Sequence, residues 1–447
     1  MGVRHAELEA SQWWPRERVL AHQWDRLRRL VRFAYDHVPY YHHVMDSLDL
    51  TPDAIRTPDD YRRLPILTKA DIRAHRDDLL VRGVARKDLI ATGSGGSTGE
   101  PVALYHDAAM VAGTKAVKLR NFRWAGWQPG DAWARLWGNN FDIAPHLQLR
   151  MRLWDRLTRV RWLTCFDMTE ETMARYAREL AAFRPDIIEA YVNPLYLFAR
   201  FLEARGLVGT IRPRGVIVSA ETLFPHQREK LGQVFGCKVF NRYGGREMGD
   251  VAHECEHGTM HLNAETIYTE FIRDGAPCQP GEPGEIILTA LDLYAMPLLR
   301  YKVEDIGSPS DAVCPCGRGL PAMEMVQGRV QDLITMRSGR YLTGVFFAHL
   351  FKDFDIARFQ VVQESLDRMV ISLVRGPSLT EGDLSYIMEK LREYTRNEIA
   401  IDLRQVDHIP LTASGKFRPT LSHVPPDLVG TGSRGTDSPQ STQRPQR

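Results

Sequence analysis

Short apolar segments alternate with amphipathic ones through the middle of the chain, from residue 131 to residue 244. The apolar segments have the length and composition of buried strands, and the segments between them carry apolar residues at helical spacing. Because such alternation connects neighbouring parallel strands, it predicts a mostly parallel sheet covered by helices. The predicted strands are 131–137, 186–192, 214–221 and 238–244, and the predicted helices are 170–183, 194–206 and 225–236.

The segments on either side of this alternation predict further units. Residues 12–45 carry apolar side chains at helical spacing, with an end near Pro39, and helical character continues to about residue 81. Short strands and Gly/Pro turns over 262–305 indicate an antiparallel element, and the segment after 332 indicates a compact α+β unit. The predicted organisation is an α/β N-terminal domain over 1–329 with a helical lead-in over 1–85, a small C-terminal domain over 330–424, and a disordered tail over 425–447.

The balance of charges excludes some classes of partner. The 447 residues include 58 basic and 56 acidic side chains, giving a net charge of +2, and the arginines are spread along the chain. This distribution argues against nucleic acid as the main partner. No apolar run approaches the ~20 residues of a membrane span, and the N-terminus has no apolar signal core. We therefore expect a cytoplasmic protein with no membrane partner.

The stretch ATGSGGSTGEPVALYHD, residues 91–107, is almost bare of large side chains. Its glycines let backbone N–H groups approach an anion closely, and its hydroxyl groups add donors, so it fits a phosphate cradle. A flexible linker explains the same composition. The stretch lacks the lysine ending of a Walker loop and the glycine order of a dinucleotide fold, so its composition leaves both interpretations open.

Polar residues follow three of the predicted strands, at the sheet edge where such folds bind ligands. The segment VSAET offers its backbone to a flat ligand. In NRYGGREMGD, Tyr243 offers a stacking face and Glu247 an oxygen ligand for Mg²⁺. Asp305, after a later strand, can accept two ribose hydroxyls. An ordinary turn with solvated side chains explains each segment taken alone.

Two further features have side chains suited to catalysis or to metal binding. Lys416 lies on a glycine-led turn, where it is either a mobile cation for a phosphoryl oxygen or a surface lysine. The six cysteines of a cytosolic chain fit free thiols or metal ligands better than disulfides. Three thiols and one imidazole make a tetrahedral zinc site, and reduced thiols in a buried turn are the alternative. The candidate ligands are Cys255, Cys314 and Cys316 with either His257 or His261.

Taken together and in this order, these segments resemble the adenylate-forming enzymes, the superfamily of acyl-CoA synthetases and other AMP-binding proteins, and most closely the phenylacetate–CoA ligase family. The resemblance runs from Leu20 to about His423. It implies a large adenylate-forming domain and a small mobile lid domain that pivots just after Arg329. The segments that carry it are RLVRFAYDHVPYYHH, LPILTKADIR, GSGGSTGEP, VSAET, YGGRE, RYKVEDIG, GRVQD and SGKFR.

The resemblance also implies a role for each matching position. Lys416 would reach the carboxylate and the α-phosphate, Glu247 would hold Mg²⁺, and Arg246 would meet the α-phosphate. The acid pocket would be walled by Trp137, Asn139 and Tyr191. The implied ATP-binding residues are Ser94, Gly95, Gly96, Ser97, Thr98 and Gly99 for the β- and γ-phosphates, Ser219, Ala220, Glu221, Tyr243 and Gly244 around adenine, and Asp305 with Arg329 at the ribose.

Three positions depart from the family pattern and indicate an atypical branch. Glu100 stands where a lysine usually ends the phosphate loop, and Gln331 stands at the pivot, which is usually Asp or Lys. Arg246 stands where a Ser or Thr hydroxyl usually meets the α-phosphate, and a guanidinium there either serves that oxygen as a different donor or blocks it.

The activity implied by the resemblance is ATP-dependent activation of an aryl or arylacetic acid to acyl-AMP, with release of pyrophosphate, followed by transfer to coenzyme A. Cations and backbone N–H groups would offset the charge that grows on the phosphoryl oxygens. Acyl transfer to an amine or alcohol, adenylylation of a different acceptor, and a non-catalytic nucleotide-binding or zinc-scaffold protein on the same fold are alternatives. The charge balance disfavours a zinc-ribbon nucleic-acid binder, and the helical N-terminus offers a surface for a homodimer.

Overall fold

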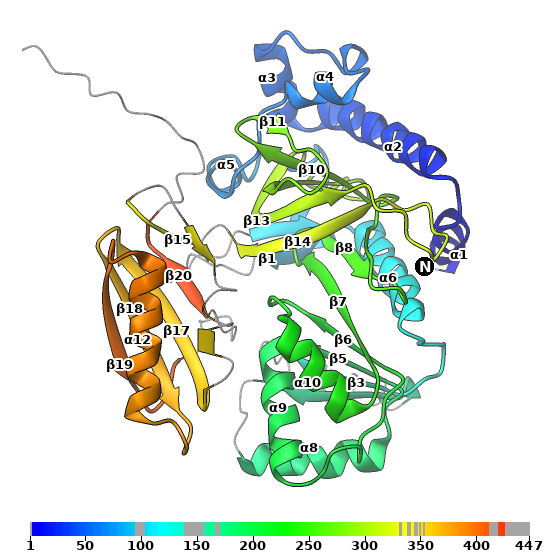
Figure 1. Ribbon diagram of the computed structural model, residues 1–447. Helices are drawn as coiled ribbons and strands as arrows, with labels where there is room; N and C mark the ends of the chain where they lie inside the picture. Colours follow the sequence, from blue (N-terminus) through cyan, green and yellow to red (C-terminus); the bar gives the residue numbers. More distant parts are fainter. Residues whose placement is uncertain are drawn as a thin grey trace, which may run out of the picture.

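The chain forms a helical lead-in, a large sheet domain and a small C-terminal domain (Figure 1). Within the described ranges, no helix is long and apolar enough to cross a membrane. The computed structural model describes residues 2–93, 103–137, 155, 157–165, 170–329, 333–337, 341–343, 347, 350–351, 354–410 and 419–424.

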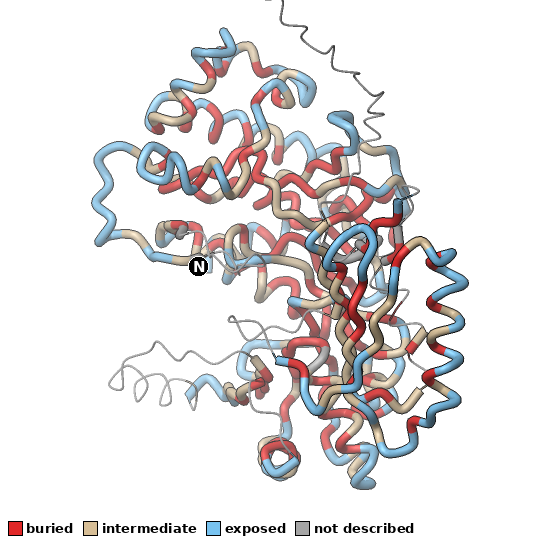
Figure 2. The backbone as a smooth tube through the Cα atoms, turned by 90° about the vertical axis from the view of Figure 1, so that its left-hand side faces the viewer, coloured by how far each residue is buried: buried red, intermediate tan, exposed pale blue. Residues whose placement is uncertain are grey.

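Short helices make up the lead-in, which lies against one end of the large sheet (Figure 1). They are α1 (Gly2–Ser11), α2 (Arg16–His37), α3 (Pro39–Ser47), η1 (Pro52–Ala54), α4 (Pro58–Arg62), α5 (Lys69–Ala74) and η2 (Arg86–Asp88). The predicted helix end near Pro39 is confirmed, because α2 ends at His37 and Val38 is extended, whereas the predicted start at residue 12 is wrong, because a turn precedes α2. The proline that follows Val38 favours this extended backbone. The inner face of α2 is buried and its outer face exposed (Figure 2).

One sheet of twelve strands forms the centre of the large domain. Its strands are β3 (Trp133–Trp137), β4 (Val160–Thr164), β5 (Ile187–Tyr191), β6 (Gly215–Ser219), β7 (Lys238–Gly245), β8 (Gly249–Glu254), β9 (Met260–Leu262), β10 (Ile267–Arg273), β11 (Ala276–Pro277), β12 (Gly284–Ala290), β13 (Tyr301–Ser310) and β14 (Ala322–Arg329). The order across the sheet is β11-β10-β12-β13-β14-β9-β8-β7-β6-β5-β3-β4. From β4 to β7 neighbouring strands pair parallel, and beyond β7 they pair antiparallel.

The parallel half is covered on both faces, which is why its strands are mostly apolar. On one face, α8 (Glu170–Phe183), α9 (Val192–Ala204) and α10 (Pro225–Phe235) pack against alternate residues such as Leu136, Ile188 and Val218 (Figure 1). On the other face, α6 (Ala108–Trp124) packs its Phe122 against Ile187. Every residue of β5 and β6 is buried.

Among the described residues, three smaller sheets accompany the large one. The hairpin β1 (Ile90–Gly93) and β2 (Ala103–His106) precedes α6. In the C-terminal domain the order is β19-β18-β17-β20, and α12 packs Ile387 and Leu391 on this sheet. The elements of this domain are β15 (Leu333–Thr335), β16 (Tyr341–Thr343), β17 (Ile356–Ser365), β18 (Arg368–Arg375), α12 (Glu381–Thr395), β19 (Ala400–Gln405) and β20 (Thr420–Ser422). In the third small sheet β15 pairs with β16.

Candidate functional site

The carboxyl ends of the parallel strands bring several predicted site residues to one edge of the sheet. The rings of Trp137 and Tyr191, at the ends of β3 and β5, lie 4.2 Å apart between centroids. Tyr191 is the register partner of Ser219, which ends β6. Ala220 follows with a φ of +71°, a strained conformation for a residue with a Cβ. Glu221 is half-buried beside it.

Two of the predicted nucleotide-binding side chains are in contact. The hydroxyl of Tyr243, on β7, donates a hydrogen bond of 2.8 Å to Oδ2 of Asp305, on β13. Asp305 is paired with Arg329 in the ladder between β13 and β14. Strand β7 and the later hairpin β13–β14 therefore bring Tyr243 into contact with Asp305 and place the backbone of Arg329 beside Asp305.

The glycines after Tyr243 end β7 and pair with β8, and residues 246–248 form the tight turn between the two strands. A Cβ at Gly244 would collide with the carbonyl oxygen of Gly249, so the close approach of these two strands requires glycine. The segment is therefore a hairpin, which is one form of the ordinary turn that the sequence left open. It lies at the same edge of the sheet. Within this turn Arg246 is exposed and Glu247 is half-buried.

The turn is connected to the glycine-rich stretch by a histidine that the sequence analysis did not single out. Nε2 of His106, at the end of β2, lies 3.1 Å from the carbonyl oxygen of Glu247 and donates to it. Burial lowers the pKa of His106, so the ring is neutral near pH 7. Because Gly93 pairs with Ala103, the glycine-rich stretch connects two hydrogen-bonded strands, as a hairpin loop does and an interdomain linker does not.

A layer of buried charge lies beneath the aromatic pair and was also missed. Glu189, on β5, is fully buried and makes ion pairs with Lys118, Arg135 and Arg242. Burial alone would raise the pKa of Glu189, but the three cations together lower it to about 2. Burial lowers the pKa of Lys118 to about 7, although Glu189 opposes this shift. Arg135 and Glu189 are each a single charged residue in the middle of a short strand, and their pairing follows only from the register of β3 and β5.

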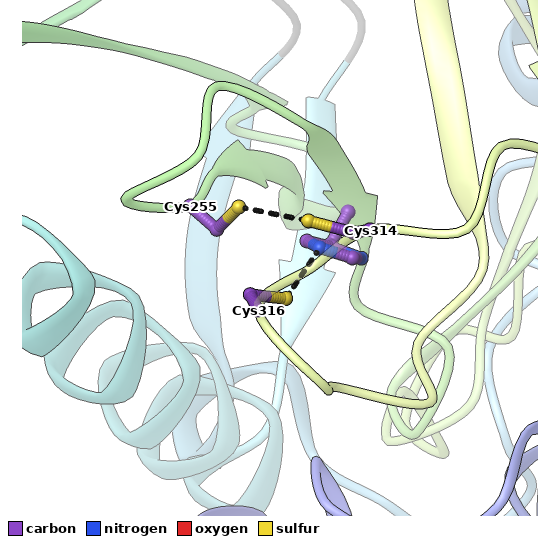
Figure 3. Close-up of side chains that lie close together, drawn as sticks. Cys255, Cys314 and Cys316 are labelled. Carbon is purple, nitrogen blue, oxygen red and sulfur yellow. Dashed lines mark hydrogen bonds between the residues drawn. The ribbon is translucent and has the colours of Figure 1, made fainter.

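Three thiols and one imidazole gather at the far end of β8 and β9 (Figure 3). Their ligand atoms all lie within 4.8 Å of one another. Sγ of Cys255 is 3.5 Å from Sγ of Cys314, and Sγ of Cys316 is 3.3 Å from Nε2 of His261. His257 lies outside this cluster, and its backbone N–H donates to Cys255 Sγ. Of the two histidines left open by the sequence, the structure therefore places His261 with the thiols.

Nδ1 of His261 donates to the carbonyl oxygen of Leu320 at 3.1 Å. This hydrogen bond fixes the tautomer and leaves Nε2 free to bind a metal, as metal-binding histidines usually are.

Several predicted site residues lie outside the described residues. They are Ser94 to Gly99 with Glu100, Asn139, Gln331 and Lys416, and the side chain of Arg329 is likewise not described.

The chain is similar in sequence to several known proteins. Residues 333–423 match the family model of the CapK C-terminal domain. The chain is 27% identical over 340 residues to a phenylacetate-coenzyme A ligase of Thermus thermophilus, covering 72% of this chain and 73% of that protein. It is 23% identical over 411 residues to Protein CapK of Staphylococcus aureus, covering 89% and 88%.

Solved structures give the same result for the fold. The 2-hydroxyisobutyryl-CoA ligase in the postadenylation state, in complex with 2-HIB-AMP, superposes with a TM-score of 0.74 at 18% identity, covering 92% of this chain and 91% of that one. The same ligase in the thioesterification state, in complex with 2-HIB-AMP and CoA, has a TM-score of 0.63 at 18% identity, with the same coverage.

The fold is therefore that of the adenylate-forming CoA ligases, a large mixed α/β domain with a small C-terminal domain. More particularly, the homologues of this chain are phenylacetate–CoA ligases and CapK, and it carries a CapK C-terminal domain. The fold class and the family resemblance predicted from the sequence are both confirmed.

Proposed function

We propose that the chain is an ATP-dependent ligase that activates a carboxylic acid to acyl-AMP, with release of pyrophosphate, and transfers the acyl group to coenzyme A. The observation that carries this proposal is the hydrogen bond from Tyr243 to Asp305, which joins the adenine and ribose residues implied by the motifs. Homology to phenylacetate–CoA ligases supports the same reaction.

In the first step a carboxylate oxygen attacks the α-phosphorus of ATP, and the bond from this phosphorus to the bridging oxygen of pyrophosphate breaks. Negative charge moves onto the phosphoryl oxygens, so fixed donors and cations there lower the barrier. We assign to Arg246 and Lys416 the stabilisation of this negative charge. Glu247 would hold Mg²⁺, which would neutralise the charge of the leaving phosphates. In the second step the sulfur of coenzyme A attacks the acyl carbon, and AMP leaves.

The hydrogen bond from His106 to Glu247 connects the hairpin β1–β2 to the turn that carries the proposed magnesium ligand. It ties the open end of the hairpin, where His106 pairs with Ile90, to the β7–β8 turn. We propose that residues Ser94 to Gly99, which connect the two strands of this hairpin, bind the β- and γ-phosphates.

The proposal is tested by pyrophosphate release from Mg·ATP with a panel of aromatic and aliphatic acids, with and without coenzyme A. Lys416→Ala should reduce acid-dependent release by about 10²- to 10³-fold, as expected for loss of a transition-state cation. Lys390→Ala is the matched control, because Lys390 is an exposed lysine of the same small domain, paired with Glu393. No release with any acid would overturn the proposal and favour a non-catalytic nucleotide-binding protein.

The same assay identifies the acceptor. Thioester formation with coenzyme A is expected, whereas acyl-AMP that reacts with an amine or an alcohol but not with coenzyme A would assign amide or ester formation instead.

We also propose that Cys255, His261, Cys314 and Cys316 hold a structural zinc ion. The donor set fits, since three thiolates and one imidazole form a closed tetrahedral site with no open position for chemistry. Backbone N–H groups of His257 and Arg318 donate to Cys255 Sγ and Cys316 Sγ, which stabilises thiolates. Zinc would tie the turn after β8 to the segment after β13.

Two expectations remain predictions. One is the cytoplasmic location. The other is a homodimer through the helical N-terminus, which is supported by the exposure of Trp13 and Leu20.

A further inference from the structure

The backbone around the strand that carries Asp305 has two residues in an unusual conformation. Arg300, directly before β13, has a φ of +52°, and Glu304, directly before Asp305, has a φ of +63°. Both values lie in the left-handed region, which residues with a Cβ occupy at a cost in free energy. Such a conformation persists only where surrounding contacts hold the backbone, so the contacts of these two residues are informative.

A bulge in β13 accompanies this strain. Two steps along β12, from Glu285 to Ile287, correspond to four steps along β13, from Ile306 back to Lys302. Residues 303–305 therefore form a bulge on the side of β13 that faces β12. Bulges next to functional sites commonly change the direction of a side chain. This bulge therefore decides whether Asp305 faces the predicted nucleotide site.

The first left-handed residue is held by the lead-in. The backbone N–H of Leu67 donates to the carbonyl oxygen of Arg300 at 3.0 Å, and that of Lys302 donates to the carbonyl oxygen of Leu67 at 3.0 Å. The guanidinium of Arg300 donates to the carbonyl oxygen of Arg62 at 2.6 Å. Leu67 and Tyr301 thereby form a parallel β-bridge, so the lead-in segment lies beside the start of β13.

The second left-handed residue is held by the same segment, through a side chain. Nζ of Lys69 makes an ion pair with Oε2 of Glu304. The pair is partly buried, because Lys69 keeps only 11% of its side-chain surface exposed and Glu304 27%. Lys69 is the first residue of α5, whose start is fixed by a capping box between Thr68 and Asp71. An anchored, partly buried pair is screened less by water than an exposed one.

Two interpretations of this ion pair differ in what they predict. The pair could only attach the lead-in to the sheet, or it could also hold Glu304 in the conformation that the bulge requires. Glycine adopts a φ of about +60° without strain, so it would keep the bulge without any partner. If the pair holds the bulge, a glycine at position 304 makes Lys69 dispensable for nucleotide binding.

We propose that Lys69 is a positioning residue of the nucleotide site, which pairs with Glu304 and so holds the bulge in which Asp305 faces the ribose of ATP. This role rests on the proposed function, because it concerns the binding of ATP at that site. Relaxation of the bulge towards regular pairing would turn the residues after Glu304, beginning with Asp305. The hydrogen bond from Tyr243 to Asp305 would then be lost.

The test compares the KM for ATP with the KM for the acid in pyrophosphate release. Lys69→Met and Glu304→Ala should each raise the KM for ATP by about tenfold, as expected when a left-handed residue loses its support. Neither change should alter the KM for the acid. Lys69→Arg should keep most of the wild-type affinity for ATP, because it retains the charge.

The glycine variant separates positioning from simple attachment. Glu304→Gly should bind ATP within about twofold of wild type, and adding Lys69→Met to it should have no further effect. If Glu304→Gly is as impaired as Glu304→Ala, or if Lys69→Met leaves the KM for ATP unchanged, the positioning role is overturned and the proposed function stands.

The matched control is Lys302→Met on the same strand. Lys302 pairs with Glu285 of β12 at 2.6 Å, and both side chains are partly exposed. Its loss should leave the KM for ATP unchanged, whereas an equal rise would assign the effect to β13 in general and overturn the role of Lys69. Near-ultraviolet circular dichroism and the thermal midpoint check that each variant is folded.

If no acid releases pyrophosphate, the proposed function fails and binding of AMP decides the role of Lys69. Calorimetry with AMP should then show about tenfold weaker binding to Lys69→Met and Glu304→Ala than to wild type, and near wild-type binding to Glu304→Gly. Equal binding of AMP to wild type and Lys69→Met, or no binding to wild type, would overturn the proposal.

Discussion

The carboxylate of Glu189 stabilises three cations that would otherwise face one another in a buried layer. We expect Glu189→Gln to reduce the free energy of unfolding of the large domain by about 3–5 kcal/mol, the cost of removing one partner from a buried ion pair. Urea denaturation followed by tryptophan fluorescence measures this, because Trp133, Trp137 and Trp162 surround Arg135. Glu203→Gln, which removes an exposed pair with Lys230, should cost about 1 kcal/mol or less.

The pH dependence gives this prediction a second readout. The pKa of Glu189 is lowered from 4.5 to about 2 in the folded protein. A lowered pKa means that the group stabilises the fold fully above pH 4.5 and loses this effect as the pH falls towards 2. The difference between wild type and Glu189→Gln should therefore shrink over that interval. A difference that stays constant would mean that ion pairing is not its source.

Single residues could be predicted from the sequence where a motif marked them. The motifs marked Tyr243 and Asp305 as residues of one nucleotide site, and the two are hydrogen-bonded. Asp305 nevertheless lies inside the antiparallel strand β13, whereas the sequence had indicated a position after a strand. Arg135 and Glu189 could not be predicted, because a lone charge in a five-residue strand is equally consistent with an exposed position. Only the register between β3 and β5 shows that these two charges meet in a buried layer.

At the scale of elements, the Cys/His cluster joins segments that are distant in sequence. Cys255 directly follows β8, and His261 lies in β9. Cys314 and Cys316 lie between β13 and β14. Cys255 and Cys314 also pack in one apolar cluster with Val19 of α2. A metal ion here would therefore stabilise the attachment of the lead-in helices as well as the two turns.

We expect purified protein to contain one zinc ion per chain and chelation to destabilise it. A metal present at 100 times its dissociation constant contributes about 2.7 kcal/mol, so its removal should lower the thermal midpoint and speed proteolysis of the lead-in. Metal analysis and limited proteolysis measure both effects. Cys316→Ser should lose the metal, and Cys278→Ser, at a half-buried thiol outside the cluster, should keep it. Metal-free protein of unchanged stability would contradict the prediction.

Helices and strands could be predicted where the spacing of their apolar residues was regular along the whole segment. The helices α8 and α10 and the strands β5 and β6 match the predicted segments closely, because each has a full apolar face to bury. The strands β1, β2 and β4, which are four or five residues long, were not predicted, because none of them shows a full apolar face in its sequence. The end of α2 near Pro39 could be predicted from the proline constraint, whereas its start could not, because the apolar spacing begins before Arg16.

At the scale of the whole molecule, the small domain sits against the carboxyl ends of the parallel strands (Figure 1). Arg200, on α9, is 3.6 Å from Asp355, which lies just before β17. Burial lowers the pKa of Arg358 on β17, and the charge of Glu221, after β6, opposes this shift, so these two groups also interact across the domains. The superposition is closer to the postadenylation state of the 2-hydroxyisobutyryl-CoA ligase than to its thioesterification state.

We therefore expect the pair Arg200–Asp355 to favour this arrangement of the domains and to break when the small domain rotates for the second step. Because the pair is partly exposed, it contributes about 1 kcal/mol or less, which is at most about a fivefold change in the population of the two arrangements. Arg200→Ala should therefore slow acyl-AMP formation relative to thioester formation by up to about fivefold in single-turnover measurements of each step. Arg205→Ala removes an arginine at the end of the same helix that pairs with Glu170 inside the large domain, and it should leave the ratio unchanged. A change of equal size in both variants would assign the effect to α9 itself, and no change in Arg200→Ala would show that the pair does not bias the rotation.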